Sequence, residues 1–216
     1  MKRLGFMLVL AIILTLPCAA VNAIAGDNYF AIKAGIFTPT GDLEDFDNAF
    51  QGEIAIGHNF NPNFGLEFGI GRFETDATYG YGGYDSEIGN WSGSETDEVT
   101  VTPVTITARG IIPIDKLSLY AGAGVGLYFA TGEVAVTGTS DIGNVSFSGD
   151  DDDMVPGVHV LAGIEYNLTP EVFAGIEARN TWTETAKFEG LIYGVPIEAE
   201  SDLNGWNIAA KIGYRF

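Results

Sequence analysis

The chain ends in Gly205-Trp206-Asn207-Ile208-Ala209-Ala210-Lys211-Ile212-Gly213-Tyr214-Arg215-Phe216, a stretch in which two kinds of residue alternate. One face carries the apolar set Trp206, Ile208, Ala210, Ile212, Tyr214 and Phe216. A strict period of two is typical of a β-strand with different surroundings on its two sides. Aromatic residues stand at both ends of the apolar face with small aliphatic residues between them, as expected of a strand that crosses a bilayer between two interfacial girdles. The stretch therefore predicts a membrane-spanning β-strand.

The N-terminus has the pattern of an export signal. Lys2 and Arg3 precede an apolar run from Leu4 to Leu16, and small residues follow up to Ala25. A basic region, a short apolar region and an A-x-A site describe a secretory signal peptide, and the run is too short for a transmembrane helix. We predict a cleaved signal peptide over residues 1–25, with cleavage after Ala23 as the alternative, and one mature domain over residues 26–216.

The charge balance excludes some classes of protein. The chain has 29 acidic and 10 basic residues, a net charge of −19. Phosphate binding needs lysine and arginine, so we expect no nucleic-acid partner. The chain also has 14 Phe, 9 Tyr and 3 Trp, a composition that argues against a disordered acidic protein.

Seven further segments alternate like the C-terminal stretch. Together the eight predicted strands are Tyr29–Phe37, Phe50–Phe60, Phe64–Phe73, Val99–Ile112, Leu117–Phe129, Val158–Tyr166, Val172–Trp182 and Gly205–Phe216. Turn-forming residues at 61–63, 113–116 and 167–170 predict three tight turns. The alternation changes phase near Pro103, where we expect either a bulge or the point at which the strand enters the membrane.

Short turns and long loops alternate between the predicted strands. The four long loops are residues 38–49, 76–98, 132–153 and 187–203. An even number of strands with short turns at one end and long loops at the other is the layout of an outer-membrane barrel. A soluble β-sandwich or lipocalin also alternates, but the loop asymmetry, the aromatic C-terminus and the uncharged mid-strand apolar faces favour the membrane. We predict an all-β fold, an eight-stranded antiparallel up-and-down transmembrane β-barrel with meander topology in a bacterial outer membrane.

With its signal peptide, alternating hairpins and terminal aromatic strand, the chain resembles the small eight-stranded outer-membrane β-barrels, the family that includes OmpX, Opa, NspA and the OmpA transmembrane domain. The resemblance is one of pattern and spans the whole mature chain. It implies that Trp206, Ile212, Tyr214 and Phe216 form an assembly signal read by the barrel-assembly machinery. It also implies contact with outer-membrane lipid and lipopolysaccharide.

The inward phase of the predicted strands carries charges of both signs. The eight residues are Lys33, Glu53, Glu67, Arg109, Glu165, Glu177, Arg179 and Lys211. Eight strands enclose a space just wide enough for side chains, and isolated charges there would be costly. We favour a closed, ion-paired lumen with the pairs Glu177–Lys211, Glu67–Arg109 and Glu53–Lys33. A narrow ion pathway lined by the same residues is the alternative.

The four long loops are strongly acidic. They hold 20 acidic residues and the single basic residue Lys187. Solvation of the exposed surface explains them most simply. Two runs, Asp42, Glu44, Asp45 and Asp47, and Asp150, Asp151, Asp152 and Asp153, are weak candidates for divalent cations because Ca²⁺ takes oxygen ligands. Neither run has the spacing of an EF-hand, so we favour solvation and expect no cofactor.

The loops also contain features of a binding surface. Tyr79, Tyr81, Tyr84 and Trp91 lie among glycines in the second loop, where they suit either partner binding or packing of the loop on itself. The third and fourth loops alternate enough to extend their hairpins beyond the membrane. Exposed strand edges of that kind can recruit partners by strand addition.

The mature chain has two histidines, His58 on the lipid-facing phase and His159 on the inward phase. Acyl transfer needs a nucleophile with a base in reach, and neither histidine is followed by a serine two residues later. We assign both to structure. We predict a monomeric, non-enzymatic surface barrel with an interaction or envelope-structural role and a possible extracellular partner. A narrow porin-like channel is the first alternative, and an outer-membrane lipid-modifying enzyme is the second.

Overall fold

The structure is a computed structural model, and it describes residues 27–87, 89–192 and 195–216. The elements are β1 (Asp27–Pro39), the 3-10 helix η1 (Gly41–Leu43), β2 (Ala49–Asn61), β3 (Phe64–Asp85), β4 (Gly89–Ile114), β5 (Leu117–Ser140), β6 (Gly143–Asn167), β7 (Val172–Thr183), β8 (Thr185–Ile192), β9 (Val195–Asp202) and β10 (Gly205–Arg215). The predicted signal peptide lies outside the described residues. Within the described part of the chain, no helix is long and apolar enough to cross a membrane.

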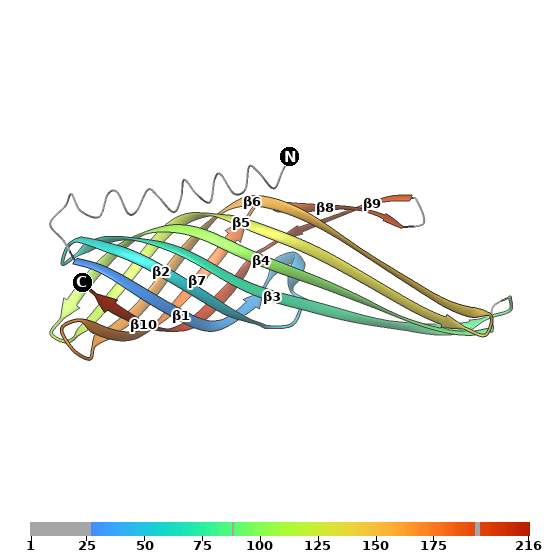
Figure 1. Cartoon of the computed structure of the whole chain (residues 1–216), viewed down its shortest axis with the longest axis horizontal. Coiled ribbons are helices and arrows are strands. Elements are labelled where there is room, and N and C mark those ends of the chain that lie inside the picture. Colours follow the sequence, from blue (N-terminus) through green and yellow to red (C-terminus); the bar gives the residue numbers. More distant parts are fainter. Residues whose placement is uncertain (1–26, 88, 193–194) are drawn as a thin grey trace.

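Eight of the strands close into a barrel in the order β1-β10-β7-β6-β5-β4-β3-β2. The closing pair is antiparallel and runs from Tyr29 opposite Arg215 to Pro39 opposite Gly205. The N–H of Phe216 then donates to the Asn28 carbonyl at 2.9 Å. The predicted eight-stranded meander and its closure are confirmed. Strands β8 and β9 form a separate two-stranded sheet at the end of the barrel opposite the C-terminus, next to β6 (Figure 1).

Side chains alternate between the lumen and the outer surface along each barrel strand. On the outside, Ile32 and Ile54 are 50% and 51% exposed, and their neighbours on the inward phase are buried. A continuous outer belt of exposed aliphatic and aromatic residues is unfavourable in water and favourable in lipid. The alternation therefore produces both the apolar belt and the packed lumen.

The three predicted tight turns lie at the end of the barrel that holds the C-terminus (Figure 1). The Asn61 side-chain oxygen accepts the Asn63 N–H at 2.8 Å, an Asx-type turn. Asp115 adopts a left-handed φ of 56°, a conformation that aspartate tolerates. The Val172 N–H donates to the Thr169 hydroxyl at 3.0 Å. Local side-chain hydrogen bonds thus keep these connections short.

Strands β3 to β6 continue far beyond the barrel as a four-stranded sheet, here called the blade (residues 73–85, 89–101, 130–140 and 143–155). It projects from the end opposite the C-terminus (Figure 1). Strand β2 stops pairing with β3 at Arg72, and β7 starts pairing with β6 at Gly157, so only these four strands extend. Extension of the third loop agrees with the sequence prediction. The prediction of a polar loop over residues 76–98 was wrong, because these residues pair in register from Asp76–Glu98 to Asp85–Gly89.

Of the two expectations for Pro103, the bulge was wrong, and entry of the strand into the membrane at this point stays a prediction. Val104 lies opposite Ile70 and Val101 opposite Phe73, so the pairing of β3 with β4 keeps one register past the proline. Pro103 itself is buried on the inward phase, between buried Val101 and Thr105. The apparent change of phase arose because inward residues become apolar here. The register of β2 with β3 shifts instead between Asn59 and Asn61.

Candidate functional site

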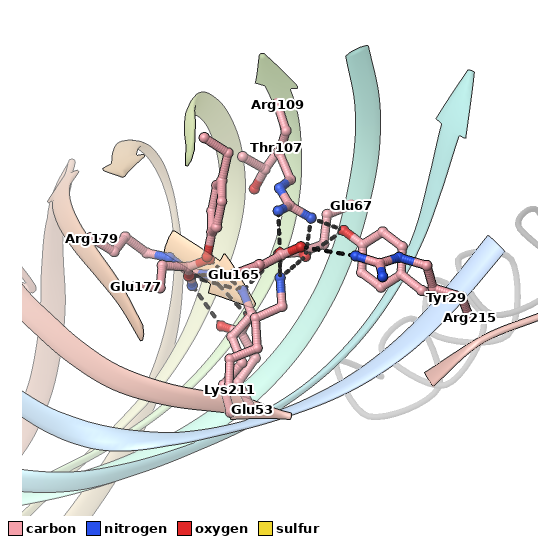
Figure 2. Close-up of polar contacts among 12 residues, drawn as sticks. Tyr29, Glu53, Glu67, Thr107, Arg109, Glu165, Glu177, Arg179, Lys211 and Arg215 are labelled. Atoms are coloured by element: carbon pink, nitrogen blue, oxygen red, sulfur yellow. Dashed lines mark hydrogen bonds and ion pairs between the residues drawn. The ribbon is translucent and has the colours of Figure 1, made fainter. Parts of the chain in front are cut away.

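All eight charged residues predicted for the lumen point into it, and each is only 1–6% exposed. They come from seven of the barrel strands: Lys33 from β1, Glu53 from β2, Glu67 from β3, Arg109 from β4, Glu165 from β6, Glu177 and Arg179 from β7, and Lys211 from β10. Figure 2 labels all of them except Lys33 and shows the ends of the labelled side chains converging inside the barrel. The eight side chains form one connected layer of ion pairs, here called the ionic layer.

Glu67 is the centre of one half of the ionic layer. Its carboxylate lies 2.6 Å from Lys33 Nζ, 3.1 Å from Lys211 Nζ and 3.2 Å from Arg109 Nη1. The Tyr29 hydroxyl donates to it at 2.6 Å. Lys33 and Lys211 lie directly opposite each other across the closing β1–β10 pair, where like charges destabilise a sheet. Because Glu67 accepts from both lysines, it compensates that repulsion at the seam.

Glu53 and Glu177 form the other half with Arg179. Arg179 donates to Glu53 at 2.6 and 3.0 Å and to Glu177 at 3.0 Å. Oxygens of Glu53, Glu67 and Glu177 lie within 4.8 Å of one another, a spacing that could hold a metal ion. Lys33 Nζ lies 2.9, 2.6 and 2.9 Å from these three carboxylates. The lysine ammonium therefore already supplies the cation that this acidic trio requires.

One of the predicted pairs was wrong. Glu67–Arg109 and Glu53–Lys33 are in contact, but Lys211 pairs with Glu67 and Glu165 rather than with Glu177. The residue opposite Glu177 on β10 is Ala209, and Lys211 lies opposite Gly175. Residue counts along the two strands placed Lys211 level with Glu177, but the observed register sets them two residues apart. Lys211 instead crosses the lumen to glutamates on strands that are not its neighbours.

Aromatic side chains close the lumen below the ionic layer. Tyr29 packs edge-on against Phe173 with ring centroids 5.6 Å apart, and the Arg215 guanidinium lies 4.4 Å from the centre of the Phe173 ring. A Cβ added at Gly57 would collide with the Tyr29 ring, and one added at Gly213 would collide with Phe173. Glycine on a neighbouring strand thus makes room for each inward ring, and the rings cover the end of the lumen near the turns.

An apolar layer fills the lumen above the ionic layer, toward the blade. Its buried members are Phe37, Leu43, Ala49, Phe73, Val99, Val101, Tyr128, Ala130, Val155, Ala186 and Leu203. Phe37 and Phe73 stack with ring centroids 4.1 Å apart. This layer was not predicted, because only the charged residues on the inward phase were singled out from the sequence. The signal was present as apolar residues on the inward phase near the long-loop end of several strands.

Residues 40–48, here called the cap, fold over the apolar layer. Leu43 of η1 is 2% exposed, and Phe46 packs against the same cluster. The Thr40 N–H donates to the Asn204 carbonyl at 3.0 Å, and the Asp202 N–H donates to Asp42 at 3.0 Å. The first long loop is therefore fastened to the segment that leads into β10, and it covers the mouth of the barrel.

The two acidic runs do not converge into a cation site. In the described residues, neither run provides three donor atoms within 4.8 Å of one another. Asp150 to Asp153 lie on one strand, so successive side chains point to opposite faces. In the first run, Asp42 accepts the backbone N–H of Asp202. Strand alternation thus disperses the carboxylates that are adjacent in sequence.

Several titratable groups of the blade are perturbed. Partial burial, and then the charge of Glu95, raises the pKa of Asp97 above its ordinary value. Burial and the nearby carboxylates of Glu74, Glu133 and Asp76 raise the pKa of Glu98. The pKa of Tyr81 rises to about 12, chiefly because its hydroxyl donates to Glu95 at 2.6 Å. Carboxylates on the blade therefore repel one another.

The two histidines occupy unlike positions. His58 lies on the lipid-facing phase and its Nδ1 is 2.7 Å from the Asn28 side-chain oxygen. His159 is 1% exposed in the lumen, with Nε2 2.8 Å from the Thr107 hydroxyl. Its Nδ1 has no hydrogen-bond partner among the described residues. His159 and Thr107 thus lie between the closed ends of the lumen, away from any substrate entering from outside.

The residues of the predicted assembly signal share the lipid-facing side of β10. Trp206, Ile212, Tyr214 and Phe216 are 50–63% exposed. Phe216 lies at the end of the barrel where the short turns are found (Figure 1). These four aromatic and aliphatic side chains therefore form one accessible stripe.

Comparison with known proteins agrees with this architecture. The model of the family "Outer membrane protein beta-barrel domain" matches residues 6–216. No curated protein sequence matches the chain. Among solved structures, Neisserial surface protein A (NspA) matches with a TM-score of 0.56 and 15% identity, over 88% of this chain and 97% of that one.

Two further solved structures match less closely. The N-terminal β-barrel domain of Pseudomonas aeruginosa OprF has a TM-score of 0.47 and 14% identity, over 88% of this chain and 99% of its own. Ail, the attachment invasion locus protein of Yersinia pestis, has a TM-score of 0.41 and 16% identity over the same shares. The family model covers nearly the whole sequence and the fold is that of NspA. The chain therefore belongs to the outer membrane protein β-barrel domain family.

Proposed function

We propose that this protein is a non-conducting, non-enzymatic barrel of the outer membrane that acts through its extracellular blade, in an interaction or envelope-structural role. The observation that carries the proposal is the filled lumen. The ionic layer lies between an aromatic layer around Phe173 and the apolar layer beneath the cap. An ion crossing the barrel would have to break several buried ion pairs, a cost of several kcal/mol for each unpaired charge. The exposed surface outside the membrane is then the part available for function.

Conductance in a planar bilayer tests the closed lumen. The folded protein, purified in detergent and added at about the same molar amount as a porin control, is expected to leave the bilayer silent. Folding is checked on a gel, where the boiled and unboiled protein should migrate differently. Stepwise conductance that disappears after boiling would overturn the proposal and favour a narrow channel.

The proposed lack of enzymatic activity rests on the burial of His159 and its contact with Thr107. Lipid A mass spectra from cells with and without the protein are expected to be the same. A mass change of an acyl chain or a headgroup that requires the protein would overturn this part. His159→Ala would then show whether the histidine takes part.

We also propose that the exposed stripe of Trp206, Ile212, Tyr214 and Phe216 is the signal by which the barrel-assembly machinery recognises β10. The exposure of these side chains on the lipid-facing side of the closing strand supports this role. Deletion of Phe216 is expected to lower the amount of folded protein in the outer membrane more than Asp150→Asn. Equal outer-membrane levels of the two variants would contradict the assignment.

A further inference from the structure

One face of the blade carries an apolar and aromatic surface outside the membrane. It continues the inward phase of the barrel strands. Each row of this surface consists of four residues that lie opposite one another on β3, β4, β5 and β6. Tyr79 lies opposite Glu95, Glu95 opposite Val136, and Val136 opposite Phe147. The next row outward is Tyr81, Gly93, Gly138 and Val145. This surface is here called the inner face of the blade.

The inner face is exposed rather than packed. Tyr79, Tyr81, Trp91 and Val145 are 37–50% exposed. The opposite face of the blade is different, because its outer rows consist of threonine, serine, glycine and asparagine with one alanine. These rows are Thr78, Thr96, Ala135 and Ser148, then Gly80, Ser94, Thr137 and Ser146, then Gly82, Ser92, Thr139 and Asn144. A contiguous apolar surface on one face only marks an interaction site.

A cavity of about 330 Å³ lies at the base of the inner face, between the blade, the cap and strands β8 and β9. Leu43, Phe46, Val134, Phe147 and Phe188 line it with apolar surface, which is continuous with the apolar layer of the lumen. The volume is at the lower end of the range for ligand pockets, enough for one large apolar side chain of a partner. The cavity therefore offers an anchor point for something that lies along the inner face.

The negative charge around the cavity indicates what kind of partner could bind there. The blade segments contain eleven acidic residues and no lysine, arginine or histidine. The carboxylates that line the cavity are Asp42, Glu95, Asp97, Glu98, Glu133, Asp150, Asp151 and Glu200, of which Glu200 already pairs with Lys187. Partial burial, and then the charge of Glu95, raises the pKa of Asp97 beside the cavity. A second copy of the chain would bring the same charge, so the complementary occupant is cationic.

We propose that the inner face of the blade, with the cavity at its base, is a docking site for a cationic amphipathic peptide segment of another protein. Apolar side chains of the segment pack on Val136, Val145 and Phe147, and its lysine or arginine residues face Glu95 and Asp97. The four rows from Ala77 to Gly83 span about 20 Å at 3.4 Å per residue, a length that suits a peptide better than a small molecule. The proposal rests on the surface role proposed above and names the chemistry of the partner.

Isothermal titration with a defined peptide tests the docking site. The probe is a twelve-residue peptide of alternating leucine and lysine, titrated into the barrel in nanodiscs of zwitterionic phospholipid, with empty nanodiscs subtracted. Its leucine–glutamate counterpart is the control peptide. The lysine peptide is expected to bind at one site per barrel, and the glutamate peptide is expected not to bind. Failure of the lysine peptide to bind would overturn the docking site and leave the closed lumen, tested by conductance, unaffected.

A matched pair of double variants separates docking from general charge attraction. Glu95→Gln with Asp97→Asn removes two carboxylates from the inner face, and Glu74→Gln with Asp76→Asn removes two from the outer face of β3, outside the lining of the cavity. The inner pair is expected to weaken binding about fivefold to tenfold, from the loss of two exposed charge contacts. The outer pair is expected to change it less than about twofold. Equal weakening by both pairs would overturn the proposal.

A third variant changes the apolar surface without changing charge. The variant is Phe147→Ser. Because Phe147 lies in the blade and not in the barrel wall, the barrel is expected to fold, and the gel shift on boiling checks this. The variant is expected to weaken binding of the lysine peptide about tenfold, because it removes the aromatic group shared by the inner face and the cavity. Unchanged binding to this variant would overturn the placement of the peptide.

Discussion

Glutamates in the lumen and carboxylates on the blade have opposite surroundings in the same chain. Each of the four lumen glutamates lies within 3.2 Å of at least two cationic groups. The blade segments have eleven acidic residues and no basic residue. Away from water an unpaired charge is costly, whereas water and salt screen exposed charges. Charge is therefore balanced where burial demands it, and the excess is left where a partner can reach it.

The largest loss of stability is expected when one negative charge of the ionic layer is removed. Glu67→Gln leaves Lys33, Lys211 and Arg109 around a neutral amide. Removing one partner of a buried ion pair costs about 3–5 kcal/mol. The free energy of unfolding, measured by urea titration of the folded barrel in lipid vesicles, is expected to fall by about this amount.

The matched control is Glu98→Gln on the blade, which removes the same charge by the same chemical change. Its neighbours in the cross-strand row are the carboxylates Asp76 and Glu133. The free energy of unfolding is expected to change by less than about 0.5 kcal/mol. Equal losses for Glu67→Gln and Glu98→Gln would contradict the contrast between lumen and blade.

A smaller effect is expected where glycine makes room for an inward ring. A Cβ at Gly57 would overlap the Tyr29 ring, whereas a Cβ at Gly52 on the same strand meets no atom within 4 Å. Gly57→Ala is expected to destabilise the barrel by about 1–3 kcal/mol, since overpacking forces side chains from their preferred positions. Gly52→Ala, facing lipid, is expected to be neutral or slightly stabilising. Indistinguishable unfolding curves for the two variants would show that Tyr29 moves aside freely.

The barrel could be predicted from the sequence because its main signal is local. Alternation in stretches such as Leu117–Phe129 assigns each side chain to lipid or lumen. The eight charged residues of the ionic layer were found by this rule alone, since every one of them lies on the inward phase. Which of them pair was less predictable, because Lys211 reaches Glu67 across the lumen instead of Glu177 on the neighbouring strand.

The blade and the apolar layer depend on contacts that are distant in sequence. The segment containing Tyr79 and Trp91 is rich in glycine and polar residues and was therefore predicted to be a loop, but its two halves pair with each other, and the half containing Trp91 also pairs with β5. Leu43 is buried only because the cap is fastened to Asp202 and Asn204. Alternation in the third loop did indicate that its hairpin extends, but the pairing of the second loop and the closure of the cap were not predicted, because both depend on partners distant in sequence.

The smallest effect concerns the pH dependence of the blade. The pKa values of Asp97 and Glu98 are raised in the folded protein, so the native blade binds protons more readily than the unfolded chain does. Its stability then increases as the pH falls from above these raised values toward the ordinary range of carboxyl groups. Amide hydrogen exchange is expected to show severalfold higher protection factors in the blade at pH 5 than at pH 7. The variant Asp97→Asn with Glu98→Gln is expected to be protected already at pH 7 and to lose this response. Lower protection of the wild-type blade at pH 5 would show that its carboxylates are stabilised by partners, as those of the lumen are.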